Sequence, residues 1–191
     1  MCDLLVVSFT FLVSTRLPFQ YDWYDLLRPY LDERNATAVG MVGTCWGSYL
    51  VTHVAAEDPV VKAGFSIHPS HVALMARLDE SETAIYEGIQ ERGSAQYFGN
   101  TPSETNNTAA GGLADSIIDK VFGSCCSFAS LQHYNSCPNP NSILSQDYYD
   151  EFESPCDHGF FTRGDTEDPA VAACVDRAFA TLVILFETFV Y

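Results

Sequence analysis

The chain has 191 residues, of which 47% are hydrophobic, and this is enough for one domain with a sizeable core. It carries 25 acidic and 9 basic residues, so its formal net charge is −16 at pH 7. Because this charge repels phosphate backbones and anionic lipid headgroups, the composition argues against nucleic acid and against a membrane as partners. We expect a single domain over residues 1–191.

Two strands and a helix are predicted in the first quarter of the chain. Residues 4–13 are apolar, β-branched and aromatic, as in a strand buried on both faces. They do not fit a targeting segment, because Asp3 stands where a basic residue is expected and no small-residue cleavage site follows. Residues 22–34 are typical of a helix that Pro29 interrupts, and residues 38–42 form a second buried strand.

The next segment, Gly43-Thr44-Cys45-Trp46-Gly47, places a cysteine at the centre of a Gly-x-nucleophile-x-Gly pattern. This pattern is typical of a nucleophile elbow, a strand-to-helix turn so tight that flanking side chains would collide. Residues 48–56 can form the helix that follows, and the positive end of its dipole favours a thiolate. We therefore predict that Cys45 is a catalytic nucleophile.

Strands and helices are predicted to alternate beyond the elbow. A short buried strand at 63–67 ends at His68-Pro69-Ser70-His71, where proline enforces an extended or turning backbone. Residues 72–92 have helical spacing, and their predicted inward positions are Leu74, Leu78, Ile85 and Ile89. Three further elements follow: a weaker strand at 94–98, a polar loop at 99–112 and a helix at 113–122.

The last third of the chain is predicted to hold an insertion and a long helix. Residues 124–155 are irregular by composition and are predicted to form an insertion or lid. The final helix is capped by Asp168 and begins with Pro169. Its predicted inward face consists of Val171, Cys174, Val175, Ala178, Leu182, Leu185 and Phe189. The alternation predicts an α/β fold with a mostly parallel sheet between two layers of helices.

The seven cysteines are odd in number, so at least one thiol is free or paired between chains. They lack the C-x-x-C pairs of zinc or thioredoxin-type sites, and the adjacent Cys125 and Cys126 are poorly placed to bridge each other. This pattern does not indicate a disulfide scaffold. It favours a reducing, cytoplasmic location.

A cysteine attacks an acyl carbon as the thiolate, so Cys45 needs a general base, and that base needs an orienting partner. His158 is the candidate base, because it lies in a loop shortly before the final helix and is followed by Gly159. Elbow hydrolases carry nucleophile, acid and histidine in that chain order. The alternative for a single histidine is a solvated or packing role.

Three blocks of sequence carry a family resemblance: residues 43–49, residues 63–71 and residues 158–165. In this order they resemble the dienelactone hydrolase family of the α/β-hydrolase superfamily, over residues 22–125 and 156–191. The resemblance implies a three-layer αβα α/β-hydrolase fold and a Cys-His-Asp triad that hydrolyses small carboxylate-bearing esters or lactones without a metal. Since only 44 residues precede Cys45, we expect this fold to be truncated at the N-terminus.

The acid of the triad departs from the family pattern. The family has a segment like Gly-Asn-Asp-Pro where this chain has Gly99-Asn100-Thr101-Pro102, so a threonine occupies the acid position. Threonine can accept a hydrogen bond from imidazole but cannot stabilise imidazolium by charge. Glu104 is the candidate replacement and Asp115 is a weaker one, while the alternative for Glu104 is an ordinary solvated surface residue.

Further site residues follow from the elbow and the resemblance. The backbone N–H of Trp46 is the predicted oxyanion donor, and the second donor, from an upstream loop in the family, is unassigned. The resemblance makes His68 part of the wall of the site, whereas the alternative for His68 and His71 is a strand-end turn with solvated rings. Arg77 and Arg163 are the candidates to bind a substrate carboxylate.

The sequence thus predicts a hydrolase of small carboxylic esters or lactones, a monomer or homodimer without cofactor. No metal site is predicted, since no carboxylate or cysteine accompanies His68 and His71 at ligand spacing. One alternative is an inactive family member that acts as a binding or regulatory protein. Another is a thiol redox protein in which Cys125 or Cys156 resolves oxidised Cys45.

Overall fold

The computed structural model describes residues 22–104, 108, 112–118 and 149–191. The strand predicted at 4–13 and most of the insertion predicted at 124–155 lie outside these residues. The described part begins with a π-helical segment, η1 (Asp22–Leu27), and continues directly as α2 (Arg28–Glu33). The helix changes type just before Pro29, which lies in the first turn of α2, so the predicted interruption is confirmed.

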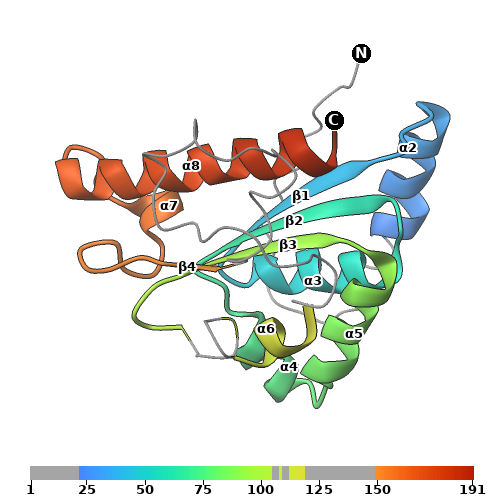
Figure 1. Ribbon diagram of the computed structural model, residues 1–191, viewed down its shortest axis with the longest axis horizontal. Helices are drawn as coiled ribbons and strands as arrows, with labels where there is room; N and C mark the ends of the chain where they lie inside the picture. Colours follow the sequence, from blue (N-terminus) through green and yellow to red (C-terminus); the bar gives the residue numbers. More distant parts are fainter. Residues whose placement is uncertain (1–21, 105–107, 109–111, 119–148) are drawn as a thin grey trace, which may run out of the picture.

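Four parallel strands form the sheet, in the spatial order β1-β2-β3-β4 (Figure 1). They are β1 (Val39–Thr44), β2 (Val61–Ile67), β3 (Ala95–Asn100) and the short β4 (Tyr149–Glu151). The first three confirm the predicted strands. β4 lies inside the predicted insertion, so that prediction is wrong here: three residues are too few to show a strand period, yet they pair with β3.

Helices cover both faces of the sheet (Figure 1), as expected for an α/β fold. On one face lie α3 (Gly47–Glu57), α4 (His71–Arg77), α5 (Glu82–Arg92) and α6 (Leu113–Ile118). The other face carries α8 (Pro169–Phe189), which the short α7 (Phe160–Arg163) precedes. Parallel strands with helices on both sides confirm the predicted α/β class.

A separate hydrophobic core fills each side of the sheet. Tyr86 and Ile89 belong to the core beneath α3 and α5, and both are fully buried. Phe65 and Leu185 belong to the core beneath α8. A Cβ atom at Gly40 would lie 2.7 Å from the ring of Phe186, so glycine allows α8 to pack closely on β1.

The single helix predicted at 72–92 is in fact two helices. The chain leaves the helical path after α4, where Asp79 has a φ of +56°, and the Ser81 hydroxyl caps α5 by accepting a hydrogen bond from the Ala84 N–H. Leu78, predicted to face inward, is therefore 44% exposed. Ile89 is buried as predicted.

The final helix confirms its predicted cap, because the Asp168 carboxylate accepts a hydrogen bond from the Ala170 N–H at 2.8 Å. Cys156 and Cys174 form a disulfide, a pairing that the sequence analysis did not predict. They are 18 residues apart in the chain, and the packing of the α7 region against α8 brings them together. Among the described helices, α8 alone is long and apolar enough to cross a membrane, and here it packs on β2 and β3.

Candidate active site

Cys45 lies in the turn between β1 and α3 and has a φ of +55°, a left-handed conformation that is uncommon outside glycine. A Cβ atom at Gly43 would lie 2.6 Å from the backbone carbonyl of Gly47, so the crossing of strand and helix requires glycine there. At Gly47 itself nothing lies within 4 Å of an added Cβ. The predicted strand, strained turn and helix are therefore present around Cys45.

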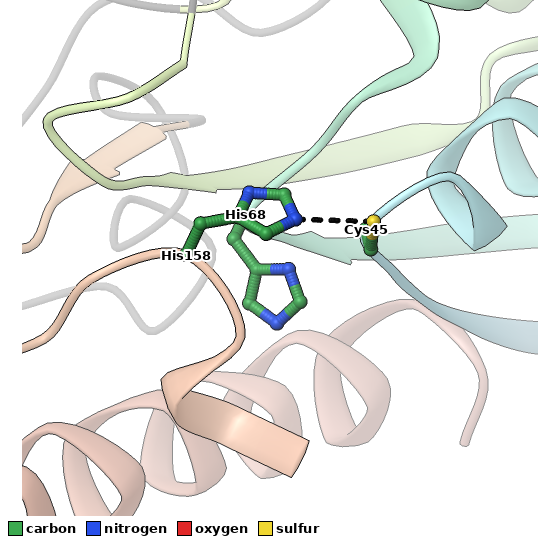
Figure 2. A group of neighbouring side chains, drawn as sticks. All are labelled: Cys45, His68 and His158. Carbon is green, nitrogen blue, oxygen red and sulfur yellow. Dashed lines mark hydrogen bonds between the residues drawn. The ribbon is translucent and has the colours of Figure 1, made fainter. Parts of the chain in front are cut away.

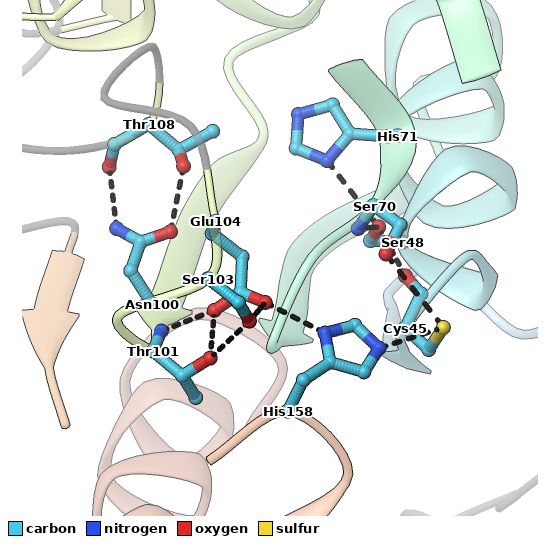
Figure 3. Close-up of polar contacts among 10 residues, drawn as sticks. All are labelled: Cys45, Ser48, Ser70, His71, Asn100, Thr101, Ser103, Glu104, Thr108 and His158. Carbon is cyan, nitrogen blue, oxygen red and sulfur yellow. Dashed lines mark hydrogen bonds and ion pairs between the residues drawn. The ribbon is translucent and has the colours of Figure 1, made fainter. Parts of the chain in front are cut away.

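His158 stands between Cys45 and Glu104, as Figure 3 shows. Its Nε2 atom is 3.1 Å from Sγ of Cys45, and its Nδ1 atom is 2.6 Å from Oε1 of Glu104. The loop that carries it ends at Gly159, whose φ of +96° lets the chain turn into α7. Three residues that were predicted as nucleophile, base and acid thus form one connected series of contacts.

Glu104 is held in the loop after β3 by its neighbours. The backbone N–H and the hydroxyl of Thr101 both donate to its Oε2 atom, and the Ser103 hydroxyl donates to Oε1 at 3.0 Å (Figure 3). The Glu104 side chain is only 3% exposed, so the alternative of a solvated surface glutamate is wrong. Asp115, the weaker candidate, belongs to α6, but its side chain lies outside the described part of the structure.

The environment favours a thiolate on Cys45 and a proton on His158. Burial raises the pKa of Cys45, but hydrogen bonds from Ser70, His158 and the Trp46 N–H, together with the charge of His158, leave that pKa below its ordinary value. Burial lowers the pKa of His158, but its hydrogen bonds to Glu104 and Cys45 and their negative charges leave that pKa raised. Both shifts favour a thiolate–imidazolium pair.

Residues that were not predicted fix the floor of the elbow. The Ser48 hydroxyl donates to the Cys45 carbonyl at 2.6 Å, and the Ser70 N–H donates to the same carbonyl at 3.1 Å. His71 contacts the Ser48 hydroxyl at 3.3 Å and the Tyr86 hydroxyl at 2.9 Å. It is fully buried, so solvation is excluded, and burial lowers its pKa to about 3. Its role is to join the turn after β2 to the elbow.

His68 lies beside the triad at the end of β2. Its ring centroid is 4.7 Å from that of His158, and its backbone has a φ of +39°. The residue is 1% exposed, so the alternative of a solvated ring is wrong. Its place near the elbow agrees with the family-based expectation. Burial, together with the nearby charges of His158 and Arg163, lowers the pKa of His68 to about 4.

Trp46 and the two predicted arginines differ in their relation to the site. Trp46 is the N-cap residue of α3, and its backbone N–H forms a hydrogen bond with the Cys45 sulfur. This is the position expected of an oxyanion donor. Arg163 ends α7, with its guanidinium close over Gly159 beside the catalytic loop. Arg77 is exposed at the end of α4, and no hydrogen bond or ion pair among the described residues joins it to the site.

Comparisons with family models, with curated proteins and with solved structures found no match for this chain. An activated thiol, a base in contact with it, an acid behind the base and a backbone donor beside the sulfur form the set that acyl transfer through a covalent intermediate requires.

Proposed function

We propose that this protein hydrolyses small carboxylic esters or lactones through a thioester on Cys45. The contact of His158 with both Cys45 and Glu104, at 3.1 and 2.6 Å, is the observation that carries the proposal. The strand, elbow and helix around Cys45 and the helices on both faces of the sheet support an α/β-hydrolase fold of the dienelactone hydrolase type.

In the first half of the reaction, the Cys45 thiolate attacks the acyl carbon. The charge that develops on the carbonyl oxygen is stabilised by the Trp46 N–H. As the bond between carbon and the leaving oxygen breaks, Nε2 of the His158 imidazolium gives its proton to that oxygen. A thioester and a free hydroxyl group result, and His158 is left neutral.

Water completes the reaction in the second half. Neutral His158 takes a proton from water through Nε2 while the water oxygen attacks the thioester carbon. The carbon–sulfur bond then breaks, the carboxylic acid leaves, and the thiolate–imidazolium pair is restored. Glu104 takes no proton in either half: it orients the ring through Nδ1 and stabilises the positive charge.

Two other features extend the proposal. Arg163 is the better of the two predicted arginines to meet a substrate carboxylate, because it lies beside the catalytic loop. The protein is proposed to act on a small molecule as a monomer or homodimer in the cytoplasm. The free Cys45 thiol favours that reducing location, although the Cys156–Cys174 disulfide is more typical of oxidising compartments.

Two contacts bear on the alternatives predicted from the sequence. An inactive binding protein was favoured by the missing acid at Thr101, but Glu104 supplies a carboxylate to His158. The redox alternative used Cys156 as resolving partner, but Cys156 is bonded to Cys174. Cys125, the other resolving candidate, lies outside the described residues.

A pre-steady-state assay with an activated aryl ester separates these functions. The hydrolase predicts a burst of aryl alcohol equal to the enzyme concentration, absent in Cys45→Ala. Thiol-dependent turnover of peroxide without ester cleavage would instead support the redox protein. Inactivity towards both ester and peroxide would support the binding protein.

A further inference from the structure

Three potential metal ligands converge at the carboxyl ends of β1 and β2. Cys45 follows β1, His68 follows β2, and His158 reaches the same point from the loop before α7 (Figure 2). One ligand atom of each, a sulfur and two ring nitrogens, lie within 4.8 Å of one another. Sulfur and imidazole nitrogen are the ligands that zinc prefers in proteins.

The buried His68 ring is the second observation that points to a metal site. Both of its ring nitrogens lack a hydrogen bond among the described residues, although the residue is 1% exposed. Buried polar atoms in proteins are nearly always paired, so an imidazole with two unpaired nitrogens beside a thiol needs an explanation.

We propose that Cys45, His68 and His158 bind one Zn²⁺ ion, with the fourth position open to water. Ligand atoms bound to one tetrahedral zinc lie roughly 3.3–3.6 Å apart. The 3.1 Å between Sγ and Nε2 of His158 is close to this spacing. All three ligand atoms lie within 4.8 Å of one another, so zinc binding requires the His68 ring to move closer to the other two ligands. The open position is typical of zinc sites with three protein ligands.

The contact between His158 and Glu104 supports the same site. Nδ1 of His158 faces the Glu104 carboxylate, so Nε2 is the nitrogen that faces the cluster. A carboxylate behind a histidine is the arrangement that orients the ligands of zinc in many metal sites. Glu104 would therefore position His158 for zinc in the same way as it positions His158 for Cys45.

Zinc and catalysis exclude each other at this site, a consequence that rests on the proposed function. Cys45 and His158 share one proton in their hydrogen bond, and zinc replaces that proton, which leaves to solvent. The sulfur then has no free charge with which to attack an ester, and Nε2 has no free electron pair with which to carry a proton. The metal would be a reversible inhibitor.

Cobalt titration of the protein with its Cys156–Cys174 disulfide intact and Cys45 as the free thiol tests the site without any activity assay. The proposal predicts one Co²⁺ per chain, with a thiolate-to-cobalt band in the near ultraviolet and ligand-field bands in the visible, and displacement by zinc. Cys45→Ser should abolish the near-ultraviolet band. His68→Asn should weaken zinc binding at least about 100-fold, whereas Glu153→Gln, which removes an exposed carboxylate that is not part of the cluster, should not.

The outcome separates this proposal from the hydrolase. Unchanged zinc affinity in His68→Asn, or a wild-type protein without the near-ultraviolet band, would overturn the zinc site even if the ester burst is found. The band without any ester burst would keep the site and contradict the hydrolase. If His68→Asn does not fold, alkylation of Cys45 in the wild-type protein is measured with and without zinc. Zinc should slow this alkylation, and equal rates would overturn the proposal.

Discussion

The backbone N–H and the hydroxyl of Thr101 both donate hydrogen bonds to Oε2 of Glu104, while Oε1 of Glu104 faces His158. Thr101 occupies the position at which the dienelactone hydrolase pattern has its aspartate. The carboxylate is thus supplied three residues further along the loop, and the residue in the acid's usual place holds it. A triad can form here without an aspartate at the expected position.

Replacement of Glu104 by glutamine should lower kcat/KM by about 10³–10⁴, because the neutral amide cannot stabilise imidazolium and can select the wrong ring tautomer. Steady-state hydrolysis of an activated ester measures the effect. Glu153→Gln, at an exposed glutamate in the loop before α7, is the matched control and should be silent. Equal activity of the two variants would show that Glu104 is not the triad acid.

Thr101→Val removes the hydroxyl donor to Glu104 but keeps the shape of the side chain and the backbone N–H. Since a hydrogen bond to a charged group contributes about 1.5–3 kcal/mol, we expect kcat to fall roughly tenfold or more. The melting temperature should change little by comparison. If kcat is unaffected, the threonine does not position the acid.

Sequence reasoning found Cys45, His158 and Glu104 for different reasons. Cys45 lies in an elbow pentapeptide, whose glycines are required by the tight turn. His158 precedes the last helix, which is the position of the histidine in elbow hydrolases. Glu104 followed only from nearness to the expected acid position. What the sequence does not contain is the network of Thr101 and Ser103 around it, because those contacts depend on the path of the loop after β3.

The pH dependence of kcat/KM should follow the thiolate–imidazolium pair. As pH falls through the lowered pKa of Cys45, the thiolate is protonated, so activity rises with pH from a limb below the ordinary thiol value of 9.0. As pH increases through the raised pKa of His158, the imidazolium loses its proton and activity falls. In Glu104→Gln the falling limb should move to lower pH. A profile that only rises, with a midpoint near 9.0, would contradict the pair.

The two glycines of the elbow should respond differently to alanine. At Gly43 the added methyl group meets backbone 2.6 Å away, which cannot yield as a side chain can, so Gly43→Ala should lower the free energy of unfolding by about 1–3 kcal/mol. Gly47→Ala meets nothing within 4 Å and begins a helix, so stability should be kept or slightly increased. Thermal denaturation of both variants tests this, and equal losses would contradict the turn geometry.

The fold was predictable where hydrophobic period and caps agree, and it was not where chain breaks depend on tertiary contacts. The last helix could be predicted because Asp168, Pro169 and an apolar face all mark it in the sequence. The break between α4 and α5 could not be predicted from the sequence, because the apolar pattern continues through Leu78 although the backbone turns at Asp79. The disulfide between Cys156 and Cys174 was equally hidden, since spacing alone does not give pairing.

Peptide mapping by mass spectrometry of the protein quenched during turnover of an activated ester tests the central claim most directly. The acyl group is expected on the peptide that contains Cys45, as a thioester that decays at the rate of turnover. In His158→Gln, a thioester formed by a high concentration of the activated ester should persist, because the base that activates water is missing. Full turnover with no acyl group on Cys45, or undiminished turnover in Cys45→Ala, would contradict the thiol hydrolase.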